Sequence, residues 1–119
     1  MIRGERRDEV MRLNKKEKEA LKKFRTKIEE LLSNKLVEIK LFGSKARGDA
    51  RKDSDLDVIV VILSGDWRTS DMVYEIATDI LLETGVCISP KVITKKEYTY
   101  LHNVGNLFLK NVIREGIAI

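Results

Sequence analysis

Residues 43–57 combine the residue types of a phosphate site and a metal site at a compact spacing. Gly43 and Ser44 follow an apolar run, and Asp55 and Asp57 open a second apolar run twelve residues after Gly43. A glycine turn lets the backbone approach a ligand closely, and a serine that starts a helical turn offers a hydroxyl and an N–H to an anion. Carboxylates are ligands that Mg²⁺ prefers. These four residues therefore predict a site for a nucleoside triphosphate and its metal ion.

The two aspartates are expected to act as a pair. Side chains i and i+2 of a strand point the same way, roughly 6–7 Å apart, so Asp55 and Asp57 project together while Leu56 points into the core. Paired carboxylates can hold two metal ions, one activating an attacking hydroxyl and the other holding the triphosphate. An isolated Asp-x-Asp is more commonly the start of a strand beside a turn. The aspartate pair indicates a metal site here because the Gly43-Ser44 turn precedes it.

The basic residues of this loop have structural alternatives. Arg47 could pair with a phosphate, or it could brace the loop through Asp49 or Asp53, and the brace is the favoured interpretation. Lys45 is expected to face solvent. The loop lacks the Gly-Lys-Ser/Thr spacing of a Walker A motif, so a different kind of phosphate site is indicated.

Length and composition narrow the class of protein. A chain of 119 residues, 43% hydrophobic and 35% charged, predicts one soluble domain. The chain has no apolar run near the roughly 20 residues of a membrane span and no signal-peptide pattern, so we expect a cytoplasmic protein without a membrane partner. With Cys87 as the single cysteine and His102 as the single histidine, disulfides, thiolate zinc sites and Ser-His-Asp triads are not expected.

The net charge of +4 is concentrated at one end of the chain. Residues 1–35 contain 12 Lys and Arg against 7 Asp and Glu, whereas residues 36–119 contain 11 against 12. Such a basic arm could attract nucleic acid or an acidic partner. A solvated, salt-bridged helix is the simpler interpretation, so nucleic acid is not a favoured partner.

Apolar periodicity and capping residues predict the element order α-β-β-α-β-α. The first half comprises a helix at 14–32 with a capping box of Asn14 and Glu17, a strand at 36–42, a helical turn at 44–47, a polar loop at 48–54 and a central strand at 56–63. The second half comprises a helix at 70–83 capped by Ser70 and Gly85, an edge strand at 86–93 containing Pro90, a helix from Thr94 that breaks near 103–105, and a helix at 106–115. Trp67 is expected in a loop, and Leu81 is expected in the core.

These elements predict an α+β domain with a small mixed sheet backed by helices. The strands on either side of Gly43 should lie side by side. We expect residues 1–33 to form a basic helical segment of the single domain 1–119, and residues 36–116 to form its core.

The order of elements and motifs resembles the signature of the DNA polymerase β-type nucleotidyltransferase superfamily. In that order a strand is followed by Gly-Ser, then by Asp-x-Asp, and then by a second strand. Over about residues 36–116 the chain resembles the minimal nucleotidyltransferases of this superfamily, the MntA-like antitoxins. The motifs that carry this closer resemblance are Gly-Ser-Lys-Ala-Arg-Gly-Asp and, after it, Ser-Asp-Leu-Asp. The resemblance implies a polymerase β-like fold that transfers a nucleoside monophosphate, typically AMP from ATP, to a protein hydroxyl with Mg²⁺ or Mn²⁺. By this likeness Gly43, Ser44 and Arg47 would bind the nucleotide, and Asp55 and Asp57 would hold the metal and be catalytic. A HEPN-domain toxin, with which the chain would form an oligomer, is the implied partner.

The chain departs from the superfamily pattern at one position. A third carboxylate is expected on a later strand, where this sequence has Cys87 or, one step along the same face, Ser89. Neither is a hard anionic ligand, and Cys87 is most simply a small buried hydrophobe. Asp49 or Asp53 could substitute. The alternative function is therefore a catalytically weak or inactive nucleotide-binding antitoxin that acts by protein binding.

Overall fold

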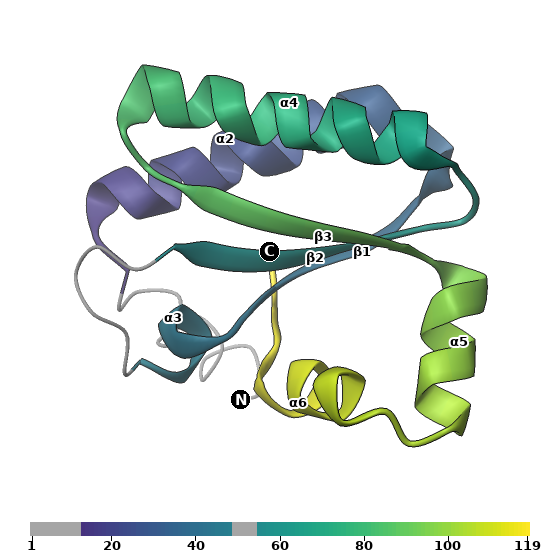
Figure 1. The fold of residues 1–119 in the computed structure, drawn as a ribbon. Coiled ribbons are helices and arrows are strands. Elements are labelled where there is room, and N and C mark those ends of the chain that lie inside the picture. Colours follow the sequence, from purple (N-terminus) through teal and green to yellow (C-terminus); the bar gives the residue numbers. More distant parts are fainter. Residues whose placement is uncertain (1–12, 49–54) are drawn as a thin grey trace.

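A mixed β-sheet with the strand order β3-β2-β1-β4 forms the centre of the fold (Figure 1). The structure is a computed structural model, and it describes residues 13–48 and 55–119. The elements are α2 (Lys15–Leu32), a 3₁₀ turn η1 (Ser33–Lys35), β1 (Leu36–Phe42), α3 (Ser44–Arg47), β2 (Leu56–Ile62), α4 (Trp67–Thr84), β3 (Ile88–Thr94), α5 (Lys95–Asn103), α6 (Leu107–Glu115) and β4 (Ile117–Ala118). β1 is antiparallel to β2 and β4, whereas β2 and β3 are parallel. The α+β prediction is confirmed.

β2 is the central strand, as its apolar sequence predicted, because it is buried on both faces. Val58, Val60 and Ile62 belong to the larger core cluster beneath α2 and α4, and Ile59 and Val61 belong to a second cluster beneath α5 and α6. Successive side chains of a strand point to opposite faces, so one apolar run supplies both layers. Burial of each Val or Ile side chain contributes about 1.5–3 kcal/mol.

The predicted capping box starts α2. The Asn14 side chain accepts the N–H of Glu17 at 2.8 Å, and the Glu17 carboxylate accepts the N–H of Asn14 at 3.0 Å. The apolar stripe of α2 lies against the sheet, and Lys23 pairs with Glu83 of α4 across the two helices. These contacts fix α2 beside α4 on one face of the sheet.

α4 begins four residues earlier than the sequence predicted. Asp66, not Ser70, is its N-cap, with an extended backbone and a side chain that accepts the N–H of Arg68 at 2.9 Å. Trp67 therefore lies in the first helical turn and not in a loop, and the Arg68 guanidinium lies 4.9 Å from its ring centre. Leu81 is 40% exposed, not part of the core. Gly85 ends the helix in the left-handed conformation, as predicted.

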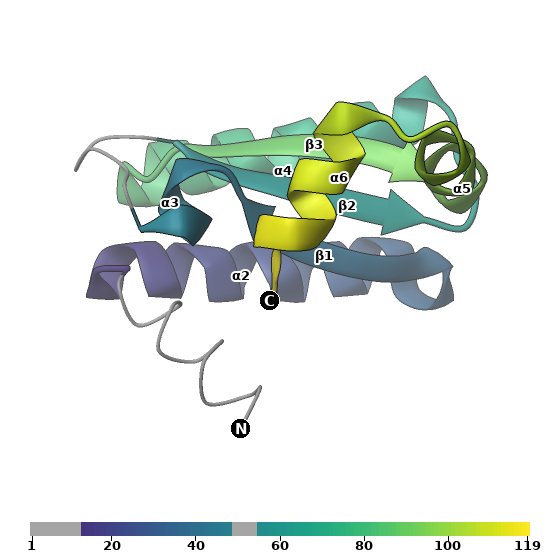
Figure 2. The same ribbon diagram turned by 90° about the horizontal axis from the view of Figure 1, so that it is seen from below.

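β4 has no counterpart among the elements predicted from the sequence. Its two residues pair with Lys40 and Leu41 of β1, and Ile117 is 1% exposed. A two-residue strand has no periodicity to detect. β4 anchors the end of α6, which crosses the strands between α3 and α5 (Figure 2). The break at 103–105 and the Thr94 capping box are confirmed.

None of the helices in the described part of the chain has the length and apolar composition for a membrane crossing.

Candidate active site

The predicted glycine turn lies directly against one of the predicted aspartates. Phe42 pairs with Asp57 in the β1–β2 register, which places the next residue, Gly43, beside the Asp57 carboxylate. Gly43 has φ +78°, and a Cβ built on it would lie 2.6 Å from Asp57 Oδ2. Both the backbone conformation and the space therefore require glycine. The two halves of the motif, separated in sequence, are in contact.

α3 presents the residues that follow the turn. Its single helical turn is closed by backbone bonds from Arg47 N–H to the Gly43 carbonyl at 3.1 Å and from Gly48 N–H to the Ser44 carbonyl at 3.0 Å. Ser44 is half-buried at the first position of this turn. The strand–turn–helix geometry thus keeps Ser44 next to the residue that touches Asp57.

The two aspartates lie within electrostatic reach of each other. Asp55 is exposed, Asp57 is half-buried, and Leu56 between them is fully buried. Burial is the largest cause that raises the pKa of Asp57; the charge of Asp55 raises it further, and the charge of Arg47 lowers it. A divalent cation would relieve this repulsion, so the donor chemistry of the pair fits Mg²⁺ or Mn²⁺. No cluster of three or more His, Cys, Asp or Glu side chains within 13–48 and 55–119 is arranged to hold a metal ion.

Ser89 lies in β3 and Cys87 directly before it, where the resemblance implies a third carboxylate. Ser89 pairs with Asp57 in the parallel register, and the Cys87 carbonyl accepts the N–H of Leu56 at 2.9 Å. Burial is the largest cause that raises the pKa of the Cys87 thiol, followed by its hydrogen bond to Asp55 and the two aspartate charges. The thiol is therefore neutral at neutral pH and does not replace a carboxylate. Cys87 is half-buried and lines a pocket, which corrects the expectation of a buried hydrophobe.

Arg47 and Lys45 hold α3 in place. Arg47 pairs with Glu115 at the end of α6, with 3.4 Å between Nη1 and Oε1, and its charge also acts on Asp57. The expected partners Asp49 and Asp53 lie outside the described residues.

Lys45 is buried, which contradicts the expectation of a solvent-facing side chain. Its Nζ lies 2.7 Å from Oε2 of Glu17, the capping residue of α2. Nothing in the sequence indicated that Glu17 and Glu115 would form ion pairs with α3, because only tertiary packing brings these distant residues to it.

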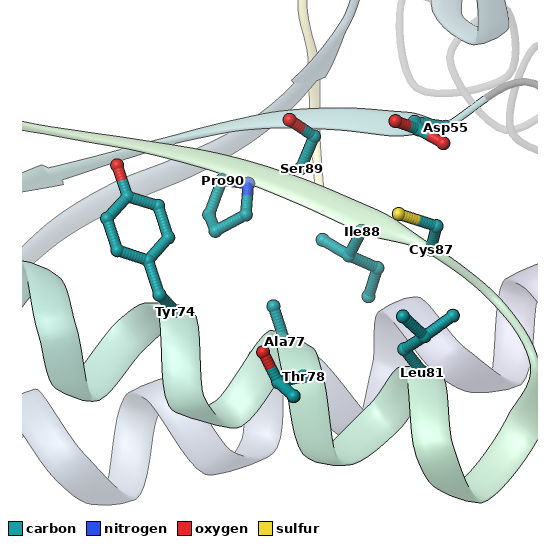
Figure 3. A pocket seen from close by; sticks show the side chains of 9 residues that line it. All are labelled: Asp55, Tyr74, Ala77, Thr78, Leu81, Cys87, Ile88, Ser89 and Pro90. Carbon is teal, nitrogen blue, oxygen red and sulfur yellow. The ribbon is translucent and has the colours of Figure 1, made fainter.

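A pocket of about 250 Å³ adjoins Asp55, between β3 and α4 (Figure 3). β3 contributes Ile88, Ser89 and Pro90, the residues directly before β2 and β3 contribute Asp55 and Cys87, and α4 contributes Tyr74, Ala77, Thr78 and Leu81. In Figure 3 the Tyr74 ring rises from α4 beside Pro90, and Asp55 lies at the other end, above Cys87. The pocket therefore connects Asp55 with one flank of α4.

The fold places a glycine turn against a strand-borne aspartate on a mixed sheet, which is the arrangement expected of a nucleotidyl-transfer site. Residues 21–115 match the nucleotidyltransferase domain family, and the chain belongs to that family. It is 34% identical over 100 residues to a candidate protein adenylyltransferase of Methanocaldococcus jannaschii, covering 84% of this chain and 94% of the relative. A second candidate protein adenylyltransferase of that organism is 35% identical over 102 residues, covering 85% and 96%. The protein is thus a nucleotidyltransferase enzyme.

One solved structure agrees with this fold. A structure described as a candidate minimal nucleotidyltransferase aligns with a TM-score of 0.52 and 25% identity, over 85% of this chain and 94% of that chain. A mutant of the toxin–antitoxin complex MntA–HpeT aligns with a TM-score of 0.49 and 17% identity, over 78% and 67%, a likeness too low to carry an inference. The first comparison confirms the predicted minimal nucleotidyltransferase fold.

Proposed function

We propose that this enzyme transfers AMP from ATP to a hydroxyl of another protein. The contact between Gly43 and Asp57, with Asp55 alongside, supports the proposal most directly. Family membership supports nucleotidyl transfer, and the names of the two Methanocaldococcus jannaschii relatives support AMP and a protein acceptor.

The proposed reaction assigns a role to each part of the site. The acceptor oxygen forms a bond to the α-phosphorus, the bond from that phosphorus to pyrophosphate breaks, and the acceptor proton leaves to water. Gly43, Ser44 and Arg47 would bind the triphosphate, and Asp55 and Asp57 would hold the metal. A bound Mg²⁺ or Mn²⁺ would supply positive charge against the triphosphate and the leaving pyrophosphate.

We further propose that the acceptor is a HEPN-domain toxin in the cytoplasm and that this chain is its antitoxin, forming an oligomer with it. The support is the resemblance of the sequences Gly43–Asp49 and Ser54–Asp57 to the motifs of MntA-like antitoxins.

The test is transfer of label from α-phosphate-labelled ATP, with Mg²⁺, to a purified HEPN-domain toxin. Label should appear in the partner and fall at least about 100-fold with Asp55→Asn or Asp57→Asn, because charge stabilisation is lost. Glu30→Gln, at an exposed glutamate of α2, is the control and should label normally. Equal labelling by Asp57→Asn would contradict the proposal. GTP, CTP and UTP in parallel would give the base preference.

The alternative is a nucleotide-binding antitoxin that neutralises by contact alone. Ser89 opposite Asp57, where the family pattern has a carboxylate, is the observation that favours it. It requires an Asp55→Asn/Asp57→Asn double variant to protect cells from the toxin as well as the wild type does. Loss of protection in a variant that still binds the toxin would reject this alternative.

A further inference from the structure

One flank of α4 exposes an apolar stripe beside the candidate active site. Trp67, Tyr74 and Leu81, spaced by seven residues and so on one flank of the helix, are 65%, 46% and 40% exposed. On the opposite flank Glu83 pairs with Lys23 of α2, so the stripe faces away from α2. Tyr74 and Leu81 line the pocket that reaches Asp55 (Figure 3). The stripe therefore leads to Asp55.

The stripe runs along a strand edge without a strand partner in the described parts of the chain. β3 is the last strand of the sheet and pairs with β2 alone among them. Ile88 and Pro90 of β3 form the pocket wall that faces α4, and Ser89 extends the lining toward the aspartates. An open strand edge offers backbone groups to an extended peptide, and a neighbouring groove offers contacts to its side chains. This geometry favours an extended polypeptide as occupant.

The charge beside the groove selects the kind of polypeptide. Asp71 and Glu75, at four-residue spacing, lie on exposed α4 surface next to the stripe, without an ion pair to any residue the structure describes. Arg68, the single cation of α4, pairs with Asp66 at 2.9 Å. The uncompensated charges of Asp71 and Glu75 repel a triphosphate from this surface and attract a cationic segment.

We infer that the groove between β3 and α4 binds the acceptor: a basic, extended segment of a protein. Its apolar side chains pack on Tyr74 and Leu81, and its hydroxyl residue lies beside Asp55. The inference rests on the proposed transfer of AMP to a protein hydroxyl and adds the place and the chemistry of the acceptor.

The probes for the test are three pools of 13-residue peptides with a central Tyr, Ser or Thr and random flanks that lack these residues. The full chain, Mg²⁺ and labelled ATP are added, and labelled peptides are sequenced by mass spectrometry. The wild type should select Lys, Arg and apolar flanks. Tyr74→Ser and Leu81→Ser should each raise the KM for peptide at least about tenfold and leave the KM for ATP within about twofold, because an apolar contact discriminates by this amount.

Matched controls separate the groove from general effects on the helix. Leu82→Ser makes the same change one residue away from Leu81 at a site that is 80% exposed and outside the pocket, and it should leave the KM for peptide unchanged. The Asp71→Lys/Glu75→Lys double variant should exchange the preference for basic flanks for acidic ones. Glu30→Lys on α2 should not.

Four results would overturn the inference. If Tyr74→Ser and Leu81→Ser weaken ATP and not peptide, the pocket belongs to the nucleotide. Label on Tyr74 of the chain itself would make that residue a modification site and not a docking surface. If ATP raises the Tm of the wild type but no pool is labelled, the groove is rejected and the proposed nucleotide site stands. Absence of both effects would reject the proposed function together with the groove.

Discussion

Gly43 and Asp57 illustrate how closely single residues are constrained in this site. The backbone of one fills the space beside the carboxylate of the other, and the positive φ of Gly43 excludes an easy replacement. The constraint explains why a glycine and an aspartate must occur at this spacing for the site to form.

We expect Gly43→Ala to lower transfer activity at least about tenfold and stability by about 1–3 kcal/mol, through backbone strain and the clash with Asp57. Gly85→Ala is a matched control, because Gly85 has φ +79° but the nearest atom to its added Cβ is Lys16 Nζ at 3.9 Å. That variant should lose stability and keep its activity while folded. Urea unfolding and AMP transfer at 25 °C measure both. Full activity in folded Gly43→Ala would contradict the assignment.

We expect Asp57→Asn to stabilise the metal-free protein while it abolishes transfer. The folded-state pKa of Asp57 is raised, so its ionisation costs stability as the pH rises from the unfolded value through the folded one. At pH 7 the neutral amide should raise the Tm in EDTA by about 1–3 °C.

Mg²⁺ should raise the Tm of the wild type and not that of Asp57→Asn. Asp79→Asn, on exposed α4 surface, should change neither value. A lower Tm for Asp57→Asn in EDTA, with an unaltered response to Mg²⁺, would show that Asp57 is a structural residue.

At the scale of elements, α3 depends on its neighbours. A four-residue helix has no stability of its own. Lys45 ties it to Glu17 of α2, and Arg47 ties it to Glu115 of α6. The element that carries Ser44 is thus positioned from both sides of the sheet.

We expect Lys45→Met to cost about 3–5 kcal/mol, because it leaves the buried Glu17 carboxylate without this cation. The Lys45→Met/Glu17→Gln double variant should cost less than the sum of the single variants by about 1–3 kcal/mol. Urea unfolding of the four proteins measures this coupling. Strict additivity would show that the ion pair contributes nothing to the attachment of α3.

The elements were predictable where the signal was local. Residues close together in the sequence determine three of the predicted features: the capping box of α2, the apolar run of β2 that is buried on both faces, and the Gly85 cap of α4. The start of α4 was not, because Asp66 and Ser70 are both good caps and only the structure chooses between them. The same limit applies to the site: spacing indicated Gly43 and Asp57, whereas the distant partners Glu17 and Glu115 required the fold.

At the scale of the whole molecule, two helical layers share one sheet. α2 and α4 cover one face, and α5 and α6 cover the other (Figures 1 and 2). Ile59 of β2 is fully buried in the second layer, with Leu109 and Val112 of α6. This cluster attaches α6, and with it Glu115, to the sheet.

We expect Ile59→Ala to cost about 2–5 kcal/mol and to lower activity by loosening α6 behind Arg47. Leu82→Ala, at an 80% exposed position, should change stability by less than about 0.5 kcal/mol. Guanidinium unfolding of both variants is the measurement. Equal costs would show that the second cluster does not hold the domain together.

The strand connections have a consequence for how such an enzyme diversifies. β1 and β2 are consecutive antiparallel strands, and Gly43 and Asp57 meet between them, whereas β2 reaches its parallel neighbour β3 through α4. The residues proposed for the nucleotide and those proposed for the acceptor are thus encoded in separate, consecutive stretches of the gene. Mutation or laboratory recombination within residues 67–94 could therefore direct the enzyme to a new acceptor protein, while the residues proposed to bind the nucleotide stay unchanged.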